Sequence, residues 1–119
     1  MLSSEKGVVK GSDFYFFSSS AISKEIFIYL FACGEFHCNT QYIVKRDDYN
    51  NFMLVYVKSG VFGVETGNNT FEAKEGDVVI LDCHKPHSYY AIKPVEFLWM
   101  HFDGKIVKDF FLAITKHDY

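Results

Sequence analysis

The stretch 61–81, VFGVETGNNTFEAKEGDVVIL, decides the fold class of this chain. Within it, Val61–Thr66 and Thr70–Ala73 are short runs with apolar residues, separated by Gly67-Asn68-Asn69. Glycine and asparagine tolerate the positive φ angles that tight hairpins require, so these two runs predict a β-hairpin. A second glycine-containing turn follows, and then the β-branched run Val78–Leu81. The stretch therefore predicts three successive short strands.

Comparable runs lie on both sides of this hairpin. We expect further strands at Phe14–Phe17, Ile26–Cys33, Phe36–Val44, Phe52–Lys58, Ser88–Ile92 and Glu96–Phe102. The run Ile26–Cys33 is almost wholly apolar and is followed by Gly34, which predicts a strand that is buried on both faces and ends there. Thirteen Phe and eight Tyr suit a pleated surface better than a helix. Short, evenly spaced strands with Gly-rich turns are typical of a β-sandwich or barrel.

The two ends of the chain differ from its centre. Residues 1–13 are polar and are expected to form a flexible N-terminal arm, and residues 14–103 to form the β domain. Residues 104–119 are expected to contain a C-terminal helix, because their apolar residues follow helical spacing at Ile106, Val107, Phe110, Phe111 and Ile114. This helix could cover an open edge of the barrel or begin an interface. We further expect the chain to be a fragment of a longer protein.

Composition excludes several classes of protein. The chain has 119 residues and a formal net charge of −3, without the basic stripe that nucleic-acid surfaces need, so it is not expected to bind DNA by itself. No segment approaches the roughly 20 apolar residues that span a membrane, and no signal peptide is visible. Its three Cys form no C-x-x-C pair, which favours reduced thiols in a cytoplasmic protein.

Arg46 is the first candidate for ligand binding. It is the only Arg in the chain, against eleven Lys, which suggests that the rigid donor fork of guanidinium is needed there. That fork can bind a carboxylate or two neighbouring hydroxyl groups. The alternative is a surface ion pair with Asp47 or Asp48, which would contribute only about 0–1 kcal/mol.

Trp99, the only Trp, is the second candidate. Alternation along the strand places Phe97, Trp99 and His101 on one face. An indole ring can stack against a sugar or a planar ligand, and its N–H supplies one hydrogen-bond donor. Since the other face is also apolar, the strand is expected to be buried on both sides, and the alternative for Trp99 is a purely structural core position.

Metal binding and catalysis find little support. A metal site needs a cluster of ligands, such as two His separated by one residue on a strand, and the strands from Phe52 to Ala73 contain no His. His84 and His87 lie in one loop without the rest of such a cluster. No nucleophile motif, paired acid–base site or phosphate-binding loop is present. We expect no metal, no cofactor and no catalytic residue.

Several segments, in this order and at this spacing, resemble the N-terminal effector-binding domain of the AraC family of transcription regulators. They are Arg46-Asp47-Asp48-Tyr49, 54–60 (LVYVKSG), 76–81 (GDVVIL), Pro86-His87-Ser88-Tyr89 and 99–104 (WMHFDG). The resemblance runs from about Tyr15 to Phe111. It implies a mainly β fold, a cupin-type double-stranded β-helix or jelly-roll barrel with a short C-terminal α-helix.

The resemblance also implies a set of ligand-binding residues. In sugar-responsive members, the positions of Arg46, Tyr89 and Trp99 line the pocket. His87, in the loop at the barrel mouth, and His101, on the face of Trp99, complete the expected set. The arabinose-responsive member uses a polar side chain at the position of Phe97, which argues against arabinose as the ligand.

The function implied is a non-enzymatic sensor of a sugar or another small polar molecule. In the full-length regulator, dimerisation and a helix-turn-helix domain downstream of this chain would convert ligand binding into altered DNA binding. The alternatives are a cupin enzyme, either an isomerase or a metal-dependent oxygenase, and a module that only dimerises because aromatic side chains fill its barrel.

Overall fold

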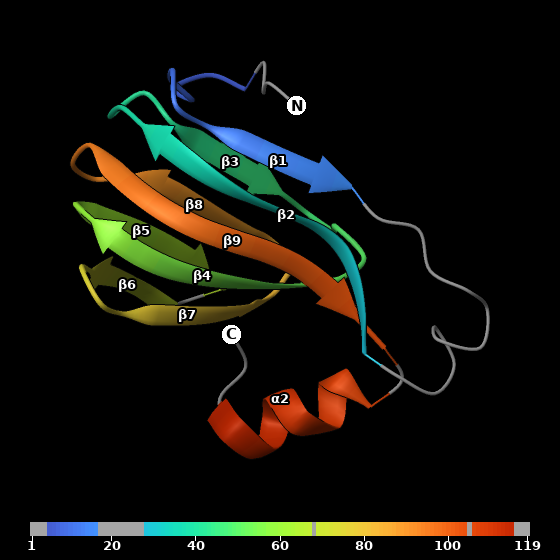
Figure 1. Ribbon diagram of the computed structural model, residues 1–119. Helices are drawn as coiled ribbons and strands as arrows, with labels where there is room; N and C mark the ends of the chain where they lie inside the picture. The colour runs from blue at the N-terminus through green and yellow to red at the C-terminus, as the bar shows by residue number, and fades with distance from the viewer. Residues whose placement is uncertain (1–4, 17–27, 68, 105, 116–119) are drawn as a thin grey trace.

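The computed structural model describes residues 5–16, 28–67, 69–104 and 106–115. In these residues two antiparallel sheets face each other (Figure 1), which confirms the mainly β, cupin-type architecture. The five-stranded sheet has the order β1 (Asp13–Phe16), β2 (Tyr29–Cys38), β9 (Val95–Asp103), β4 (Phe52–Ser59) and β7 (Val78–Asp82). The four-stranded sheet has the order β3 (Ile43–Arg46), β8 (His87–Ala91), β5 (Val61–Thr66) and β6 (Asn69–Lys74).

The hairpin predicted from 61–81 is present as β5 and β6. Its register pairs Thr66 with Asn69, and Gly67 has a φ of 54°, in the left-handed region that favours glycine. Strand β7 follows the second turn and pairs with β4 in the other sheet. The chain therefore changes sheets between β6 and β7, as a jelly-roll requires.

The prediction that a strand ends at Gly34 is wrong. Strand β2 continues through Gly34 to Cys38. A Cβ atom at Gly34 would lie 2.8 Å from Cζ2 of Trp99 on β9 and 2.7 Å from Cβ of Phe14 on β1. The glycine therefore provides room for neighbouring side chains inside a strand rather than a turn. Residues 26 and 27, also assigned to this strand, lie outside the described residues.

The single strand predicted for Phe36–Val44 is also wrong, because a turn divides it into the end of β2 and the start of β3. The side chain of Asn39 accepts a hydrogen bond from the backbone N–H of Gln41 at 2.9 Å, and its carbonyl accepts one from Tyr42 N–H at 3.1 Å. Asparagine stabilises turns through its own side chain in this way. The apolar residues on both sides concealed this turn in the sequence.

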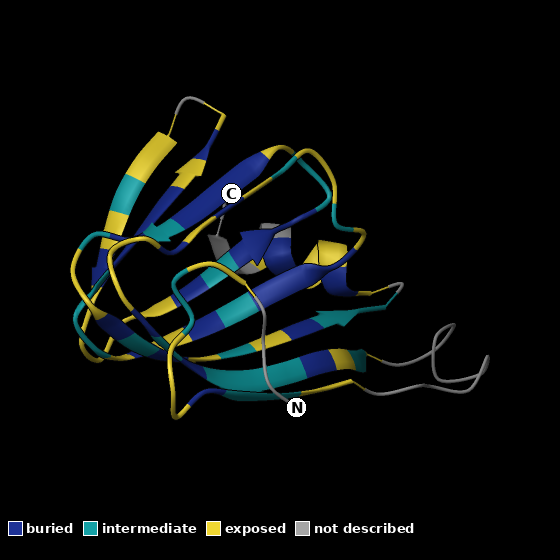
Figure 2. Cartoon of the chain, turned by 90° about the horizontal axis from the view of Figure 1, so that it is seen from above, coloured by how far each residue is buried: buried dark blue, intermediate teal, exposed yellow. Residues whose placement is uncertain are grey.

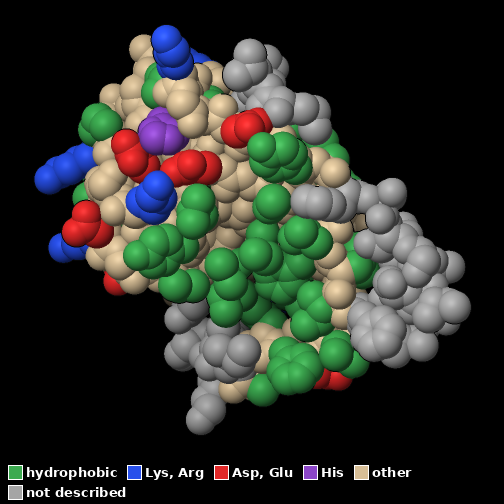
Figure 3. Space-filling view, viewed as in Figure 1, with side chains coloured by type: hydrophobic (Ala, Val, Ile, Leu, Met, Phe, Trp, Pro, Cys, Tyr) green, Lys and Arg blue, Asp and Glu red, His purple; other side chains and the backbone are tan. Residues whose placement is uncertain are grey.

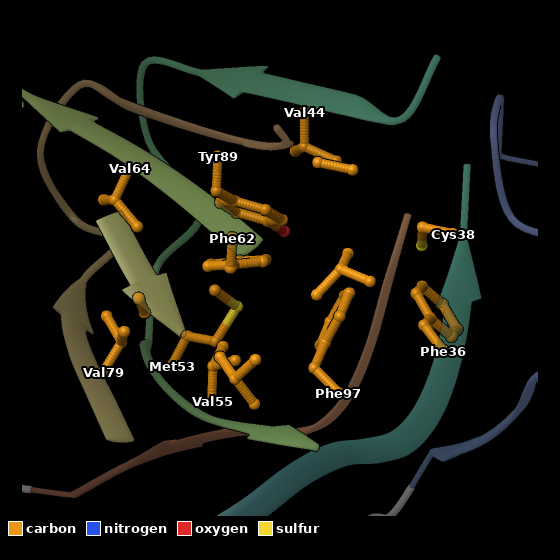
Figure 4. Packing of buried hydrophobic residues seen from close by; sticks show 14 of the residues in the cluster. Phe36, Cys38, Val44, Met53, Val55, Phe62, Val64, Val79, Tyr89 and Phe97 are labelled. Carbon is orange, nitrogen blue, oxygen red and sulfur yellow. The ribbon is translucent and has the colours of Figure 1, made fainter. Parts of the chain in front are cut away.

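The hydrophobic core lies between the two sheets (Figures 2 and 4), and most of its residues alternate along their strands. Val55 and Val57 of β4 face Phe62 and Val64 of β5, and all four are fully buried. Figure 4 shows the rings of Phe62 and Tyr89 one above the other in this interior, with centroids 5.7 Å apart. Burial of a side chain of this size contributes roughly 1.5–3 kcal/mol.

Strand β9 is buried on one face only, so the prediction of burial on both faces is wrong. Phe97 and His101 point inward and are buried, whereas Leu98 and Met100 are 42% and 38% exposed. Figure 3 shows apolar side chains gathered on this outer side of the five-stranded sheet and towards the helix. The apolar character of the outer face misled the sequence interpretation because an exposed leucine is common on protein surfaces.

The C-terminal helix, α2 (Val107–Thr115), packs beneath the five-stranded sheet. Val107 and Phe111 are buried against Phe52 of β4, whereas Ile106 and Phe110 remain 42% and 55% exposed. The helix therefore covers the end of the sheet with only part of its predicted apolar stripe; the side chain of Ile114 is not described. No helix in the described residues has the length and apolar character needed to cross a membrane.

Candidate functional site

A narrow cavity of about 60 Å³ lies between the sheets, and aromatic side chains form most of its wall. The strands β1, β2, β9 and β4 of the five-stranded sheet contribute one side, and β3 and β8 of the four-stranded sheet contribute the other. The lining residues are Glu5, Phe14, Phe16, Ala32, Phe36, Tyr42, Arg46, Tyr49, Met53, Tyr89, Phe97, Trp99 and His101. Four of the five residues predicted to bind a ligand, Arg46, Tyr89, Trp99 and His101, are therefore brought to one cavity.

Arg46 ends β3 and turns its guanidinium towards the cavity. Its Nη1 donates a hydrogen bond to Oη of Tyr89 at 3.2 Å, and its Cζ lies 4.0 Å from the centre of the Tyr49 ring. Among the described residues no carboxylate forms an ion pair with it, so the surface ion pair with Asp47 or Asp48 is not observed there. The chain thus holds a half-buried cation by a hydroxyl group and a ring face.

Tyr89 lies two residues beyond His87 on β8, next to β3. Burial raises the pKa of its hydroxyl above the ordinary value, although the nearby Arg46 charge opposes this shift. The hydroxyl accepts from Arg46 and stays protonated, so it still has a proton to donate. Tyr42 is similar, because burial raises its pKa well above the ordinary value.

Trp99 stands on β9 with its ring among other aromatic side chains. Its ring centroid lies 5.1 Å from that of Phe36 and 5.4 Å from that of His101, with the planes steeply inclined in both cases. Its Nε1 is buried, and no described residue accepts a hydrogen bond from it. An indole N–H left without an acceptor is unusual in a folded protein and is costly unless a bound molecule satisfies it.

His101 is neutral in this environment. Burial, and to a smaller extent the charge of Arg46, lower its pKa to about 3. Its Nδ1 donates to the side-chain oxygen of Asn51 at 2.8 Å, which fixes the ring against Tyr49, whose centroid is 4.8 Å away. His101 thus contributes a fixed, uncharged polar ring to the cavity wall.

His87 occupies a different place from the other four predicted residues. It is buried, its Nδ1 lies 2.7 Å from the carbonyl oxygen of Lys85, and its ring stacks on Tyr89 with centroids 6.0 Å apart. It is not among the described side chains that line the cavity. Burial lowers its pKa, so a neutral ring supports Tyr89 from behind.

The model of the AraC-like ligand-binding domain family matches residues 32–119, which is well over half of the chain. The chain belongs to this family. The match includes every residue predicted to bind a ligand, whereas β1 and the arm precede it. No curated protein sequence matches the chain.

Solved structures place this AraC-like domain in the cupin fold. A cupin superfamily protein from Desulfitobacterium hafniense is similar over 87% of this chain and 84% of its own, with a TM-score of 0.58 and 13% identity. An HTH_3 family transcriptional regulator from Vibrio cholerae is similar over 76% of this chain and 49% of its own, with a TM-score of 0.57 and 13% identity. An ectoine synthase from P. lautus is similar over 66% of this chain and 59% of its own, with a TM-score of 0.52 and 18% identity. At these identities the likeness shows the fold alone.

Sequence reasoning missed several cavity residues of this AraC-like domain. Phe14 and Phe16 come from β1, Phe36 from β2 beyond the misplaced strand end, and Tyr42 and Tyr49 from the ends of the connections around β3. Tyr49 carried a usable signal, because it follows Arg46 at a spacing that lets a cation contact a ring. Phe14, Phe16 and Phe36 carried none, because an inward Phe on a strand has the same appearance in sequence whether it fills a core or lines a cavity.

His84, in the turn after β7, and His87, the first residue of β8, do not face one site. His84 lies between two carboxylates, with Nδ1 2.8 Å from Asp82 and Nε2 3.1 Å from Asp103, whereas His87 turns to Tyr89. The described residues contain no group of three or more His, Cys, Asp or Glu side chains arranged to hold a metal ion. Burial also raises the pKa of Cys38 and of Cys83 to about 12, so both remain unreactive thiols.

Proposed function

We propose that this AraC-like domain senses a small molecule in the cavity between its sheets, as part of a cytoplasmic transcription regulator. The ligand is a sugar or another small polar molecule, bound without chemical change. The single observation that carries the proposal is that Arg46 and Trp99, 53 positions apart in the sequence numbering, line one cavity. The family supports a ligand-binding role.

Each cavity residue has a definite part in this proposal. Trp99 stacks against the ligand, while Arg46 and Tyr89 donate hydrogen bonds to its polar groups. His101 adds a polar ring edge, and His87 keeps Tyr89 in position. Exclusion of water by the aromatic walls strengthens each of these hydrogen bonds.

Ligand entry requires the mouth of the cavity to open. A volume of about 60 Å³ is well below the roughly 300–1,000 Å³ of typical small-molecule sites. Phe14, Phe16 and Glu5, which precede the matched family region, line the cavity, and Val8 forms an isolated β-bridge with Cys38. We propose that the arm and β1 move when a ligand binds, and that this movement carries the signal.

The signal acts on DNA through a helix-turn-helix domain outside this chain, in a regulator that dimerises. Three apolar side chains are exposed in this region: Leu98 and Met100 on the outer face of β9, and Phe110 on α2. Their exposure supports an interface there in the full-length protein. A ligand can shift the regulator only by its difference in affinity for the two states. The full-length regulator should therefore bind its effector with different affinity when it is on DNA.

Binding is tested with a panel of pentoses, hexoses and small organic acids added to the purified domain. A compound that binds the folded state raises the midpoint of thermal unfolding. For each active compound, we expect the rise to be lost in Arg46→Ala and in Trp99→Ala, and kept in Lys45→Ala, an exposed neighbour on β3. Equal rises in all four proteins would show that the compound binds elsewhere and that this cavity is not the sensor.

The second candidate is a cupin enzyme, because an ectoine synthase shares the fold. Such an enzyme would convert its substrate in the same cavity. If the domain instead senses, NMR spectra of an active compound incubated with it are unchanged over hours, and removal of metal with a chelator leaves the unfolding midpoint unchanged. Turnover, or stoichiometric metal in the purified protein, would favour the enzyme.

A further inference from the structure

The charged groups in the cavity lining indicate the charge of the ligand. Arg46 is the only Lys or Arg among the lining residues, and no described carboxylate forms an ion pair with it. A half-buried charge held only by a hydroxyl group and a ring face is incompletely compensated, and a bound anion would compensate it. Glu5 is the one described carboxylate in the lining, and it is an exposed residue of the arm.

Two neutral polar groups of the cavity have a proton that they can donate to a ligand. The Trp99 N–H has no acceptor among the described residues, and Tyr89 still has its hydroxyl proton after accepting from Arg46. A neutral sugar presents hydroxyl groups that need acceptors as well as donors. A carboxylate presents only acceptors, and its flat pair of oxygens matches the guanidinium fork.

The walls restrict the rest of the ligand. Phe14, Phe36, Phe97 and Trp99 surround a narrow space, so the body of the ligand is best flat and apolar. A tetrahedral phosphate with two negative charges suits this space poorly, because one Arg compensates only one charge and the aromatic walls cannot replace its hydration.

We propose that the effector is a small planar monocarboxylate, with its carboxylate on Arg46 and its flat body against Trp99. This inference rests on the proposed sensing function and adds the chemical class of the ligand. The pair of Arg46 and Tyr89 then recognises charge, and the aromatic wall recognises shape.

Benzoate and its neutral amide analogue, benzamide, form the decisive pair of probes, with D-glucose and D-xylose as neutral sugars. Trp99 is the only Trp, so the intrinsic fluorescence of the chain reports directly on this cavity. We expect benzoate to bind about tenfold to a hundredfold more tightly than benzamide, the range typical of one added hydrogen bond to a charged group. For variants whose fluorescence is itself altered, isothermal titration calorimetry measures the two dissociation constants and so the same preference for benzoate over benzamide.

Matched variants locate this preference. Arg46→Gln should abolish the preference for benzoate over benzamide, Arg46→Lys should keep part of it, and Lys45→Gln, which removes an exposed charge on the same strand, should leave it unchanged. Glu5→Gln removes the negative charge at the rim and should strengthen benzoate binding without affecting benzamide. Circular dichroism confirms that each variant is folded.

The outcomes distinguish failure of the carboxylate inference from failure of the proposed sensing cavity. Equal binding of benzoate and benzamide, or a sugar that binds more tightly than benzoate and depends on Arg46, overturns the carboxylate inference and leaves the sensing function intact. If none of the four probes changes Trp99 fluorescence or the unfolding midpoint, the carboxylate inference is wrong. If probes bind, but equally well to Arg46→Gln and Trp99→Phe, the cavity assignment itself fails.

Discussion

The guanidinium of Arg46 and the hydroxyl of Tyr89, 43 positions apart, meet at 3.2 Å across adjacent strands of the four-stranded sheet. This hydrogen bond joins the only Arg of the chain to a buried hydroxyl whose pKa is raised by burial. It gives the cavity a fixed cationic end, while most of the remaining wall is aromatic. The stability of the domain and its binding chemistry are therefore coupled at this pair.

Tyr89→Phe should lower the free energy of unfolding by about 1.5–3 kcal/mol, because the ring still packs on Phe62 but a hydrogen bond to a charged group is lost. Urea unfolding measures this change. Arg46→Gln should lower the free energy of unfolding by a similar amount. The loss in the double variant should be smaller than the sum of the two single losses, because both substitutions remove the same hydrogen bond. Strict additivity would mean that the hydrogen bond does not form in solution.

Gly34→Ala should destabilise the domain by roughly 1–3 kcal/mol, because the added Cβ would come within 2.4 Å of the Asp13 carbonyl oxygen and 2.8 Å of the Trp99 ring. The displaced indole should also change the fluorescence spectrum of the folded protein. Cys33→Ala, at the neighbouring position on the other face of β2, should leave the spectrum unchanged. An unshifted Gly34→Ala spectrum would show that β1 and Trp99 can separate at this point.

The stability of the domain should fall with acid because of His101. Its folded-state pKa of about 3 lies below the ordinary value near 6.5, so the unfolded chain binds its proton first as the pH falls. The contribution of His101 is complete above pH 6.5 and is lost towards pH 3, with a slope of up to ~1.4 kcal/mol per pH unit.

Urea unfolding at several pH values, compared between the parent chain and His101→Gln, isolates this effect. The variant keeps a polar group near Asn51 but cannot titrate, so its stability should vary less steeply between pH 6.5 and pH 4. Parallel pH profiles for the two proteins would contradict the buried, neutral state of His101.

Phe111→Ala should cost about 3 kcal/mol or more if helix α2 is an integral part of the domain, since Phe111 is buried against Phe52. Phe110→Ala is the matched control, because Phe110 is 55% exposed and should change stability by no more than about 0.5 kcal/mol. Calorimetry of the two variants compares them directly. Similar effects in both would mean that the helix does not dock through Phe111.

Local sequence patterns were sufficient for most of the fold. The β5–β6 hairpin followed from glycine and asparagine, whose backbone preferences act within a few residues. The inward face of β9 followed from alternation, which a pleated strand imposes whatever its neighbours are. Strand ends were harder to predict: Gly34 continues β2, because its role depends on Trp99 and Phe14, which are brought next to it only when three strands pair.

The sequence by itself determined a mainly β chain with a short terminal helix, and it singled out Arg46 and Trp99 as unusual residues. Only the tertiary structure decided that both line one narrow cavity, that His87 stands behind Tyr89 instead of in the lining, and that no described carboxylate forms an ion pair with the guanidinium. The physical reason is the range of the forces involved. Backbone preference and alternation act between near neighbours in sequence, whereas burial and charge compensation depend on which strands come together across the barrel.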